Sequence, residues 1–342
     1  MKKLSFLWVL SLFAILIAFV LAPHAGYGQQ KVITLNYANI WPATHRNSIN
    51  ADLWAKEVEK RTNGRVKVTV FHGGTLTPMQ LIYDNVVKGI ADVGVSVFSY
   101  TRGKFPLMEV VDLPLGCKNA IVATQLVNEV YKKFKPKELD DVRIMYLHAH
   151  GPGLLHTTKK PVNKMEDLKG MRIRAAGTIT RIVSYLGGAP VGMPMGDTYD
   201  ALSRGVADGA FAPMEALEGW KWGEVVKYTT ESYSIAYTNG MYVIMNKAKW
   251  NSLPPDIQNI IEKINEEWIV KQAKIWDEGD KSGKTFALKR GNQMITLSPE
   301  ESERWAKAVK PMFTDYVKNS KDKGLPGEEA LNFCLNYLKA HQ

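Results

Sequence analysis

Alternation of apolar and polar positions predicts strands along the chain, with helical periodicity between them. Residues 32–39 and 65–71 alternate with the two-residue period of a half-buried strand. Residues 51–62, between these strands, carry apolar side chains at helical spacing, and Asn63 and Gly64 follow as a C-terminal cap. Helix and strand patterns continue to alternate toward the C-terminus. This order predicts an α/β fold in which helices cover the sheets.

One segment of this pattern occurs twice. Residues 83–92 (YDNVVKGIAD) recur as residues 199–208 (YDALSRGVAD), and an apolar strand follows each copy. In each copy a predicted helix ends on a cation, Lys88 or Arg204, which the negative end of the helix dipole favours, and a glycine then supplies a positive φ. The repeat predicts two similar α/β lobes. Breakers at residues 150–153 indicate a crossing between them.

A long helix is predicted near residue 255. It begins at about Pro255 or Asp256, because proline is tolerated in the first turn of a helix. Apolar side chains then recur at helical spacing, and no breaker occurs before Gly279. Beyond that position only Gly283 interrupts the pattern before Gly291. A helix of this length can contact two lobes at once.

The N-terminal segment has the layout of a secretory signal peptide. Two lysines precede an apolar run from Leu4 to Ala22, and small residues and breakers follow up to Gly28. We therefore expect residues 1–28 to be cleaved and the mature protein to work in the periplasm. The alternative is an uncleaved membrane anchor, since the run is long enough to span a bilayer.

The charge balance initially leaves a nucleic-acid partner open. The chain has 342 residues, with 44 Lys and Arg against 34 Asp and Glu and a formal net charge of +10. Such a length suits about two domains. Nucleic-acid binding requires a patch or groove of basic residues with several stacking aromatics. The densest basic segments, residues 132–137 and 159–160, are short and contain a single aromatic, Phe134. We therefore interpret the lysines as solvated surface and predict no nucleic-acid partner.

The sequence contains no motif of the common hydrolases, metalloproteases or nucleotide-binding loops. His148 and His150, two residues apart on a predicted strand, could form a metal pair. No third ligand stands at a suitable spacing, so packed histidines are the favoured interpretation. Cys117 and Cys334 could form a disulfide or be small buried residues. We predict no enzyme activity, no metal and no cofactor.

Residues 168–176 (LKGMRIRAA) contain the strongest candidate for a binding site. A turn precedes a short strand on which Arg172 and Arg174 share one face. Two interpretations are open at this point: both arginines face solvent, or one of them points into a cleft between the lobes. In a cleft, the planar guanidinium could hold a carboxylate with two parallel hydrogen bonds.

The order of these segments resembles the solute-binding proteins of tripartite ATP-independent periplasmic (TRAP) transporters, of the C4-dicarboxylate-binding (DctP) type. The resemblance implies a two-lobed fold like that of type II periplasmic binding proteins, with a cleft between the lobes and a long helix spanning both. It also implies delivery of the ligand to a membrane permease. The segments that carry it are residues 54–58 (WAKEV), 62–64 (TNG), 88–92 (KGIAD), 112–114 (DLP), 167–174 (DLKGMRIR), 199–209 (YDALSRGVADG) and 253–255 (LPP).

Pattern and resemblance together divide the chain. We expect lobe I at residues 31–152 and about 238–278, lobe II at residues 153–237 and about 279–310, and C-terminal helices packing on the lobes at residues 311–342.

The resemblance also assigns candidate ligand-binding residues. The carboxylate-binding arginine of the family falls on Arg174, which leaves Arg172 as a surface or structural residue. Asn39 matches a family position near the ligand, and Met195 matches one that packs against it.

Other positions depart from members that bind polar acids. Leu155 and Ala212 stand where such members carry polar residues, and an acid that holds a cation in some members has no counterpart near Phe211. We predict that Leu155, Phe211 and Ala212 are ligand-binding residues. Buried polar groups of a ligand would lack partners here, so we expect a monocarboxylate with an apolar or aromatic body. Aromatic residues that could stack on such a body, or simply pack in the core or rim, are Trp41, Trp220, Trp222 and Tyr237.

Two other interpretations of the sequence are open. The chain could be the binding protein of an ABC importer, which would close on its ligand in the same way but serve a different permease. It could also be an exported enzyme on a two-lobed scaffold, for which the sequence offers no recognisable acid–base pair.

Overall fold

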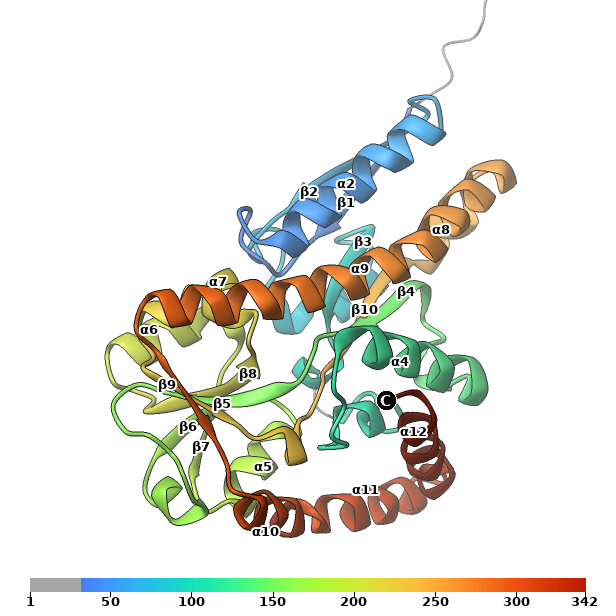
Figure 1. Cartoon of the computed structure of the whole chain (residues 1–342). Coiled ribbons are helices and arrows are strands. Elements are labelled where there is room, and N and C mark those ends of the chain that lie inside the picture. The colour runs from blue at the N-terminus through green and yellow to red at the C-terminus, as the bar shows by residue number, and fades with distance from the viewer. Residues whose placement is uncertain (1–31, 102) are drawn as a thin grey trace, which may run out of the picture. The chain divides into compact units, whose positions relative to one another are not determined.

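Two β-sheets, each flanked by helices, organise the chain (Figure 1). The computed structural model describes residues 32–101 and 103–342, so the predicted signal segment lies outside the described residues. Residues 34–342 form one compact unit. Its helices are α2 (Arg46–Arg61), α3 (Ile82–Val87), α4 (Ala120–Phe134), α5 (Ile179–Tyr185), α6 (Thr198–Ser203), α7 (Ala216–Gly219), α8 (Lys247–Asn251), α9 (Pro255–Lys289), α10 (Pro299–Val309), α11 (Pro311–Asp322) and α12 (Gly327–His341).

We call the first sheet, together with its helices, lobe I. Its strand order is β2-β1-β3-β10-β4. β1 and β3 are parallel, whereas β10 runs antiparallel to both β3 and β4. A late segment of the chain therefore returns to the interior of this sheet. The strands are β1 (Ile33–Ala38), β2 (Val66–Phe71), β3 (Val93–Val97), β4 (Val142–Ala149) and β10 (Gly240–Asn246).

The second sheet, with its helices, is lobe II. Its strand order is β11-β9-β5-β8-β6-β7. β6 pairs in parallel with β7 and β8, and β5 pairs antiparallel with β8 and β9. The strands are β5 (Gly153–Thr157), β6 (Arg172–Ala175), β7 (Ala189–Gly192), β8 (Gly209–Pro213), β9 (Tyr228–Glu231) and β11 (Gln293–Thr296). The predicted α/β, two-lobed fold is confirmed; the lobe boundaries by residue number stay a prediction.

The helix predicted over residues 51–62 is α2, which begins earlier, at Arg46. The earlier start has a local cause. His45 has extended backbone dihedrals, and its Nδ1 accepts a hydrogen bond from the backbone N–H of Asn47 at 3.2 Å. A side chain that satisfies a free N–H of the first turn is a helix cap, and histidine is not among the residues usually sought there.

The two copies of the sequence repeat share a hydrogen-bonding pattern. Asp92 Oδ2 accepts a hydrogen bond from the backbone N–H of Asn36 in β1 at 2.8 Å, and Asp208 Oδ2 accepts one from Arg172 in β6 at 2.9 Å. The glycine at the helix exit has a φ of 74° in the first copy and 69° in the second. The aspartate therefore recurs because it ties the start of one strand to the neighbouring strand in each lobe.

The predicted long helix is α9, a single helix of 35 residues. Its first half packs on lobe I, where Trp54 Nε1 donates to Asn265 Oδ1 at 3.0 Å. Its second half packs on lobe II through glycines, because a Cβ at Gly283 would lie 2.0 Å from the carbonyl oxygen of Met214. The glycines that resemble breakers in the sequence are thus positions of close approach. Figure 1 shows α9 running along both lobes.

The C-terminal helices run from lobe II to lobe I (Figure 1). In α11, Asp315 accepts hydrogen bonds from Arg181 and, at 2.9 Å, from Tyr185 of lobe II. The next residue, Tyr316, donates its hydroxyl to the carbonyl of Leu107 in lobe I at 3.0 Å. Two neighbouring residues of one helix therefore hold both lobes.

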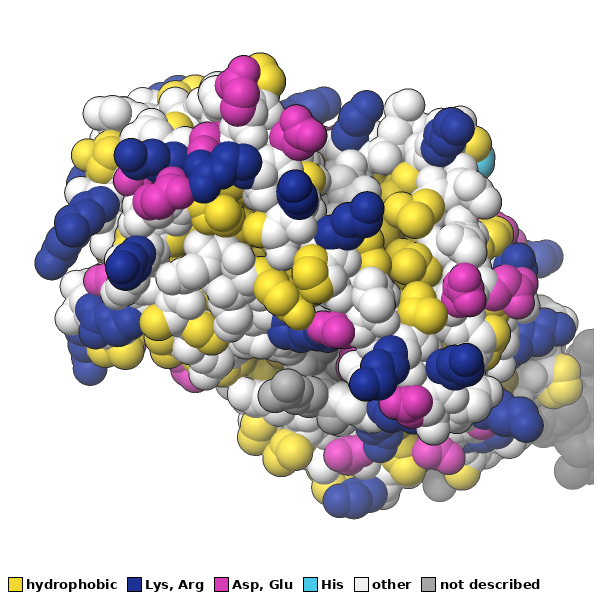
Figure 2. Space-filling model, turned by 90° about the horizontal axis from the view of Figure 1, so that it is seen from below, with side chains coloured by type: hydrophobic (Ala, Val, Ile, Leu, Met, Phe, Trp, Pro, Cys, Tyr) yellow, Lys and Arg dark blue, Asp and Glu magenta, His cyan; other side chains and the backbone are white. Residues whose placement is uncertain are grey.

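Three observations concern the cysteine pair, a membrane-spanning helix and the basic surface that the sequence raises. Cys117 and Cys334 are both buried and unpaired. Within residues 32–101 and 103–342, no helix is long and apolar enough to cross a membrane. On the face shown in Figure 2, Lys and Arg side chains are interspersed with Asp and Glu.

Candidate ligand-binding site

A cavity lies where the two lobes meet, and we call it the ligand cavity. The structure brings four of the six predicted ligand-binding residues to its wall: Arg174, Met195, Phe211 and Ala212. Its volume is about 40 Å³, close to that of one water molecule and far below that of an organic acid. A ligand can therefore enter only when the lobes open, and side chains of the wall must move to make room for it as the lobes close again. The other lining residues are Ile40, Trp41, Val97, Tyr100, His150, Ala176, Ile179, Pro213, Glu215, Trp220, Tyr237, Asn239, Met241 and Trp276.

The two other predicted residues lie behind this wall. Asn39 is buried and donates to Ser48 Oγ at 2.8 Å, while its Oδ1 accepts from the backbone N–H of Trp41 at 3.4 Å. It therefore supports the turn that carries Trp41. Leu155 is buried in β5 and pairs across the strand with Phe211.

Arg174 projects from β6 and is only 4% exposed. Its Nε and Nη2 donate to the carbonyl oxygen of Met193 at 3.0 and 2.8 Å. The carbonyl fixes the guanidinium plane, and a guanidinium carries further N–H donors. In the described part of the chain, no acidic side chain forms an ion pair with Arg174. A buried cation without a counter-ion is well suited to an anionic ligand.

Arg172, two residues earlier, has a different environment. Its side chain is half-exposed, and Nη2 lies 3.0 Å from Asp208 Oδ1 in an ion pair. Hydrogen bonding from Arg172 lowers the pKa of Asp208. Arg172 thus joins the second copy of the repeat to β6, and of the two arginines only Arg174 lines the ligand cavity.

Aromatic side chains from both lobes form much of the wall. Trp41, Trp220, Trp276 and Tyr237 all line the ligand cavity. Trp222, which the sequence also suggests, is instead fully buried in the lobe II core. Trp276 is missed by sequence reasoning, because its position in the apolar stripe of α9 gives no sign that it faces a cavity.

Glu215 is the second residue that sequence reasoning misses, and it corrects the expectation that no acid lies near Phe211, because both residues line the ligand cavity. It follows β8, is 2% exposed, and lines the same cavity as Arg174. Its Oε1 lies 2.7 Å from Nε2 of His45, which comes from lobe I and is equally buried. The rings of Trp41 and Trp220 lie 5.9 and 5.6 Å from the His45 ring. An acid and a histidine thus meet across the lobes beside the cavity.

His148 and His150 are packed side chains. Trp276 Nε1 donates to His148 Nδ1 at 3.0 Å, and burial lowers the pKa of His148 to about 3. His150 Nε2 accepts from the backbone N–H of Asn239 at 3.0 Å, and burial lowers its pKa as well. Within the described residues no group of three or more His, Cys, Asp or Glu side chains is placed to hold a metal ion.

The lobes also touch beside the ligand cavity. The backbone N–H of Met195 donates to the hydroxyl of Tyr100 at 3.0 Å. Gly177 of lobe II packs so closely on Ser99 of lobe I that a Cβ there would lie 2.5 Å from the Ser99 Cβ. The structure is therefore a closed arrangement of the two lobes.

A closed cleft between two α/β lobes, lined by aromatic side chains and by a buried arginine that no acid of residues 32–101 or 103–342 pairs with, defines a binding protein for a small anionic solute. Residues 37–319 match the family model of the bacterial extracellular solute-binding proteins, family 7 (DctP). The chain belongs to this family.

Solved structures with similar folds come from the same class. A TRAP periplasmic solute-binding protein from Desulfovibrio salexigens is 32% identical, with a TM-score of 0.80 over 91% of this chain and 97% of that one. One from Rhodoferax ferrireducens holds copurified benzoate and is 27% identical, with a TM-score of 0.85 over 91% and 98%. One from Bordetella bronchiseptica holds (R)- and (S)-mandelate and is 26% identical, with a TM-score of 0.84 over 91% and 100%.

Proposed function

We propose that this protein captures an organic monocarboxylate with an apolar or aromatic body in the periplasm and delivers it to the membrane permease of a TRAP transporter. The observation that carries the proposal is Arg174, a buried arginine with no acidic partner among the described residues, in an aromatic-walled cavity between two lobes. The carboxylate binds to Arg174, and closure of the lobes buries the rest of the ligand.

The wall of the ligand cavity supports an apolar body. Burial of apolar area contributes about 25 cal/mol per Å², and aromatic pairs add to this. A sugar acid would bring several hydroxyl groups against Met195, Phe211 and Ala212, which offer no side-chain hydrogen bonds. Each unpaired polar group costs about 1–3 kcal/mol.

Glu215 supports a single carboxylate. A dicarboxylate that places one end on Arg174 brings its second negative charge into a cavity that Glu215 also lines. Like charges in a site that excludes water repel more strongly than in bulk solvent. The benzoate and mandelate found in the two relatives are aromatic monocarboxylates, which agrees with this charge distribution.

Calorimetric titration of the purified protein tests the proposal. We expect benzoate or mandelate to bind, and succinate and glucuronate to bind at least about tenfold more weakly, a difference of about 1.4 kcal/mol. Arg174→Ala should reduce the affinity of the best ligand by about tenfold to a hundredfold, because hydrogen bonds to charged groups contribute about 1.5–3 kcal/mol.

Arg172→Ala is the matched control, since it removes an arginine from the same strand without altering the cavity. Preference for succinate or glucuronate would contradict the proposed ligand class. Equal affinity losses in the two variants would contradict the role of Arg174.

A further inference from the structure

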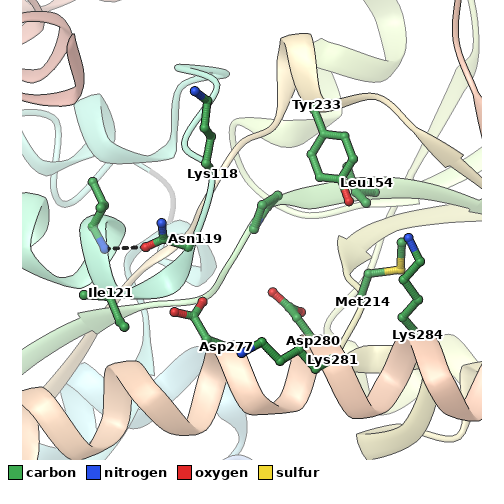
Figure 3. A pocket seen from close by; sticks show the side chains of 12 residues that line it. Lys118, Asn119, Ile121, Leu154, Met214, Tyr233, Asp277, Asp280, Lys281 and Lys284 are labelled. Atoms are coloured by element: carbon green, nitrogen blue, oxygen red, sulfur yellow. Dashed lines mark hydrogen bonds between the residues drawn. The ribbon is translucent and has the colours of Figure 1, made fainter. Parts of the chain in front are cut away.

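A second and larger cavity lies near Pro152, where the chain crosses from lobe I to lobe II, and we call it the hinge cavity. Its volume is about 480 Å³. Pockets of this size at domain interfaces commonly hold small molecules. The lining residues are Lys118, Asn119, Ile121, Val122, Pro152, Leu154, Met214, Tyr233, Asp277, Asp280, Lys281 and Lys284 (Figure 3).

The two cavities lie on opposite sides of the same backbone segments. His150 lines the ligand cavity and Pro152 the hinge cavity. In α9, Trp276 lines the ligand cavity and its neighbour Asp277 the hinge cavity. After β8, Pro213 lines the ligand cavity and Met214 lines the hinge cavity. Residues that line the ligand cavity are therefore only one or two sequence positions from residues that line the hinge cavity.

The walls of the hinge cavity come from both lobes. Lys118 to Val122, at the start of α4, belong to lobe I, and Leu154, Met214 and Tyr233 belong to lobe II. Ile121 is 39% exposed and Tyr233 is 46% exposed, although both are large apolar side chains. Exposed apolar side chains on both walls favour a molecule with an apolar body.

The floor of the hinge cavity is acidic. Asp277 Oδ1 accepts from the backbone N–H of Ala120 at 2.6 Å, and Asp280 Oδ1 accepts from that of Glu215 at 2.9 Å. Each bond uses one carboxylate oxygen. Figure 3 shows both carboxylates pointing from α9 toward the space between the walls.

The lysines around the hinge cavity balance the charge of Asp277 and Asp280 only in part. Lys284 Nζ lies 2.7 Å from Glu231 Oε1, which neutralises it. Lys118 and Lys281 are exposed. The amino group of Lys118 points away from the two acids in Figure 3, whereas that of Lys281 lies on the side of Asp277, where its charge opposes the rise in the pKa of Asp277 that burial causes. Burial and the neighbouring Glu215 and Asp277 raise the pKa of Asp280 to about 8, although Arg46 opposes the shift. A cation next to Asp280 would stabilise its ionised carboxylate and lower its pKa.

We propose that the hinge cavity is a second binding site, which takes a small organic ammonium ion with an apolar body and, when filled, favours the closed arrangement of the lobes. The ammonium group binds between Asp277 and Asp280, and the body packs between Ile121 and Tyr233. Because the two cavities flank one hinge, closing the ligand cavity separates the walls of the hinge cavity. Opening the lobes narrows the hinge cavity, so an occupant opposes opening.

Binding of a probe amine in the absence of any carboxylate tests the site itself. Phenethylammonium should bind saturably, and phenethyl alcohol, of nearly the same shape without the charge, should bind at least about tenfold more weakly. Asp280→Asn keeps the acceptor for the Glu215 N–H and should weaken the binding of phenethylammonium by a similar factor. The matched control is Asp256→Asn, which removes an exposed acid from the first turn of the same helix.

Tyr233→Ala distinguishes the hinge cavity from the ligand cavity, because Tyr233 lines only the former. We expect this variant to weaken the binding of phenethylammonium severalfold. No saturable binding at millimolar amine, equal binding of the alcohol, or a loss in Asp280→Asn without one in Tyr233→Ala would each overturn the proposal.

A second titration tests the coupling, which rests on the proposed carboxylate function. Saturating phenethylammonium should tighten the binding of benzoate or mandelate, and the carboxylate should tighten the amine by the same factor, as linkage requires. Amine binding without tightening would overturn the coupling and leave the carboxylate function intact. If no carboxylate binds, the proposed function fails, and the amine titration alone decides the second site.

Discussion

At the scale of single residues, Arg174 and Glu215 line one cavity with opposite charges, and in the proposed function this pair restricts the ligand. A monocarboxylate satisfies the arginine and presents an uncharged body to the acid. His45, 2.7 Å from Glu215, belongs to the opposite lobe, so the acid also contributes to the contact between lobes. A change at Glu215 therefore affects both selectivity and closure, and only a ratio of affinities separates the two effects.

Glu215→Gln should relax the selection against a second carboxylate. We expect the affinity of isophthalate relative to benzoate to rise by about tenfold or more, equivalent to about 1.4 kcal/mol, because the negative charge in the cavity is removed. Glu218→Gln is the matched control, since Glu218 pairs with Arg46 and does not line the cavity. An unchanged ratio of the two affinities would show that Glu215 does not select against dicarboxylates.

The difference between Arg174 and Glu215 shows what sequence reasoning can reach. Arg174 is predictable because a strand pattern and a family motif fall on the same few residues. Glu215 has no such signal: it approaches the cavity only because two lobes meet there and α9 packs tightly on the adjacent Met214. The α/β elements follow from local periodicity, whereas the placement of β10 inside the first sheet and of Trp276 on the wall of the ligand cavity depends on contacts between distant segments.

At the scale of elements, α9 owes its packing to two glycines in its second half. A Cβ at Gly279 would lie 2.7 Å from Glu215 Cγ, and one at Gly283 would lie 2.0 Å from the Met214 carbonyl oxygen. Glycine inside a helix is normally unfavourable by about 0.5–1 kcal/mol relative to alanine. Here the close approach of lobe II outweighs that cost.

Gly283→Ala should therefore destabilise the protein, against the usual effect of this substitution in a helix. We expect a loss of about 1–3 kcal/mol in the free energy of unfolding, because the backbone of Met214 cannot move aside easily. Chemical denaturation followed by tryptophan fluorescence measures it. Lys274→Ala, at an exposed position of the same helix, should change stability by less than about 0.5 kcal/mol. Stabilisation by Gly283→Ala would contradict this account of α9.

At the scale of the whole molecule, closure depends on how nearly the lobes can approach. Gly177 and Ser99 meet with no room for a Cβ, and Gly177 has a φ of 55°. A side chain at this position would hold the lobes apart next to Ala176 and Tyr100, which line the ligand cavity. Its effect should fall on retention of the ligand, because the contact exists only in the closed arrangement.

Gly177→Ala should increase the dissociation rate of the bound carboxylate at least severalfold, as measured by stopped-flow fluorescence. Gly170→Ala provides the control: Gly170 has a φ of 77° in the same lobe, and a Cβ there would meet no atom within 4 Å. Both variants carry a similar backbone cost, of about 1 kcal/mol. Only Gly177→Ala should alter dissociation, and equal effects of the two substitutions would argue against steric control of closure.

The place of β10 in the first sheet has a consequence for the order of folding. β10 lies between β3 and β4 and pairs with both. β4 therefore cannot join the rest of the sheet until residues 240–246 have been synthesised and have taken their place in it. By then β5 to β9 of the second sheet are already present as a continuous stretch of chain. Lobe II can therefore acquire most of its structure first, while β3 and β4 wait with unpaired edges that are prone to aggregate. Completion of lobe I by a distant strand is the contact of high sequence separation expected to limit the folding rate.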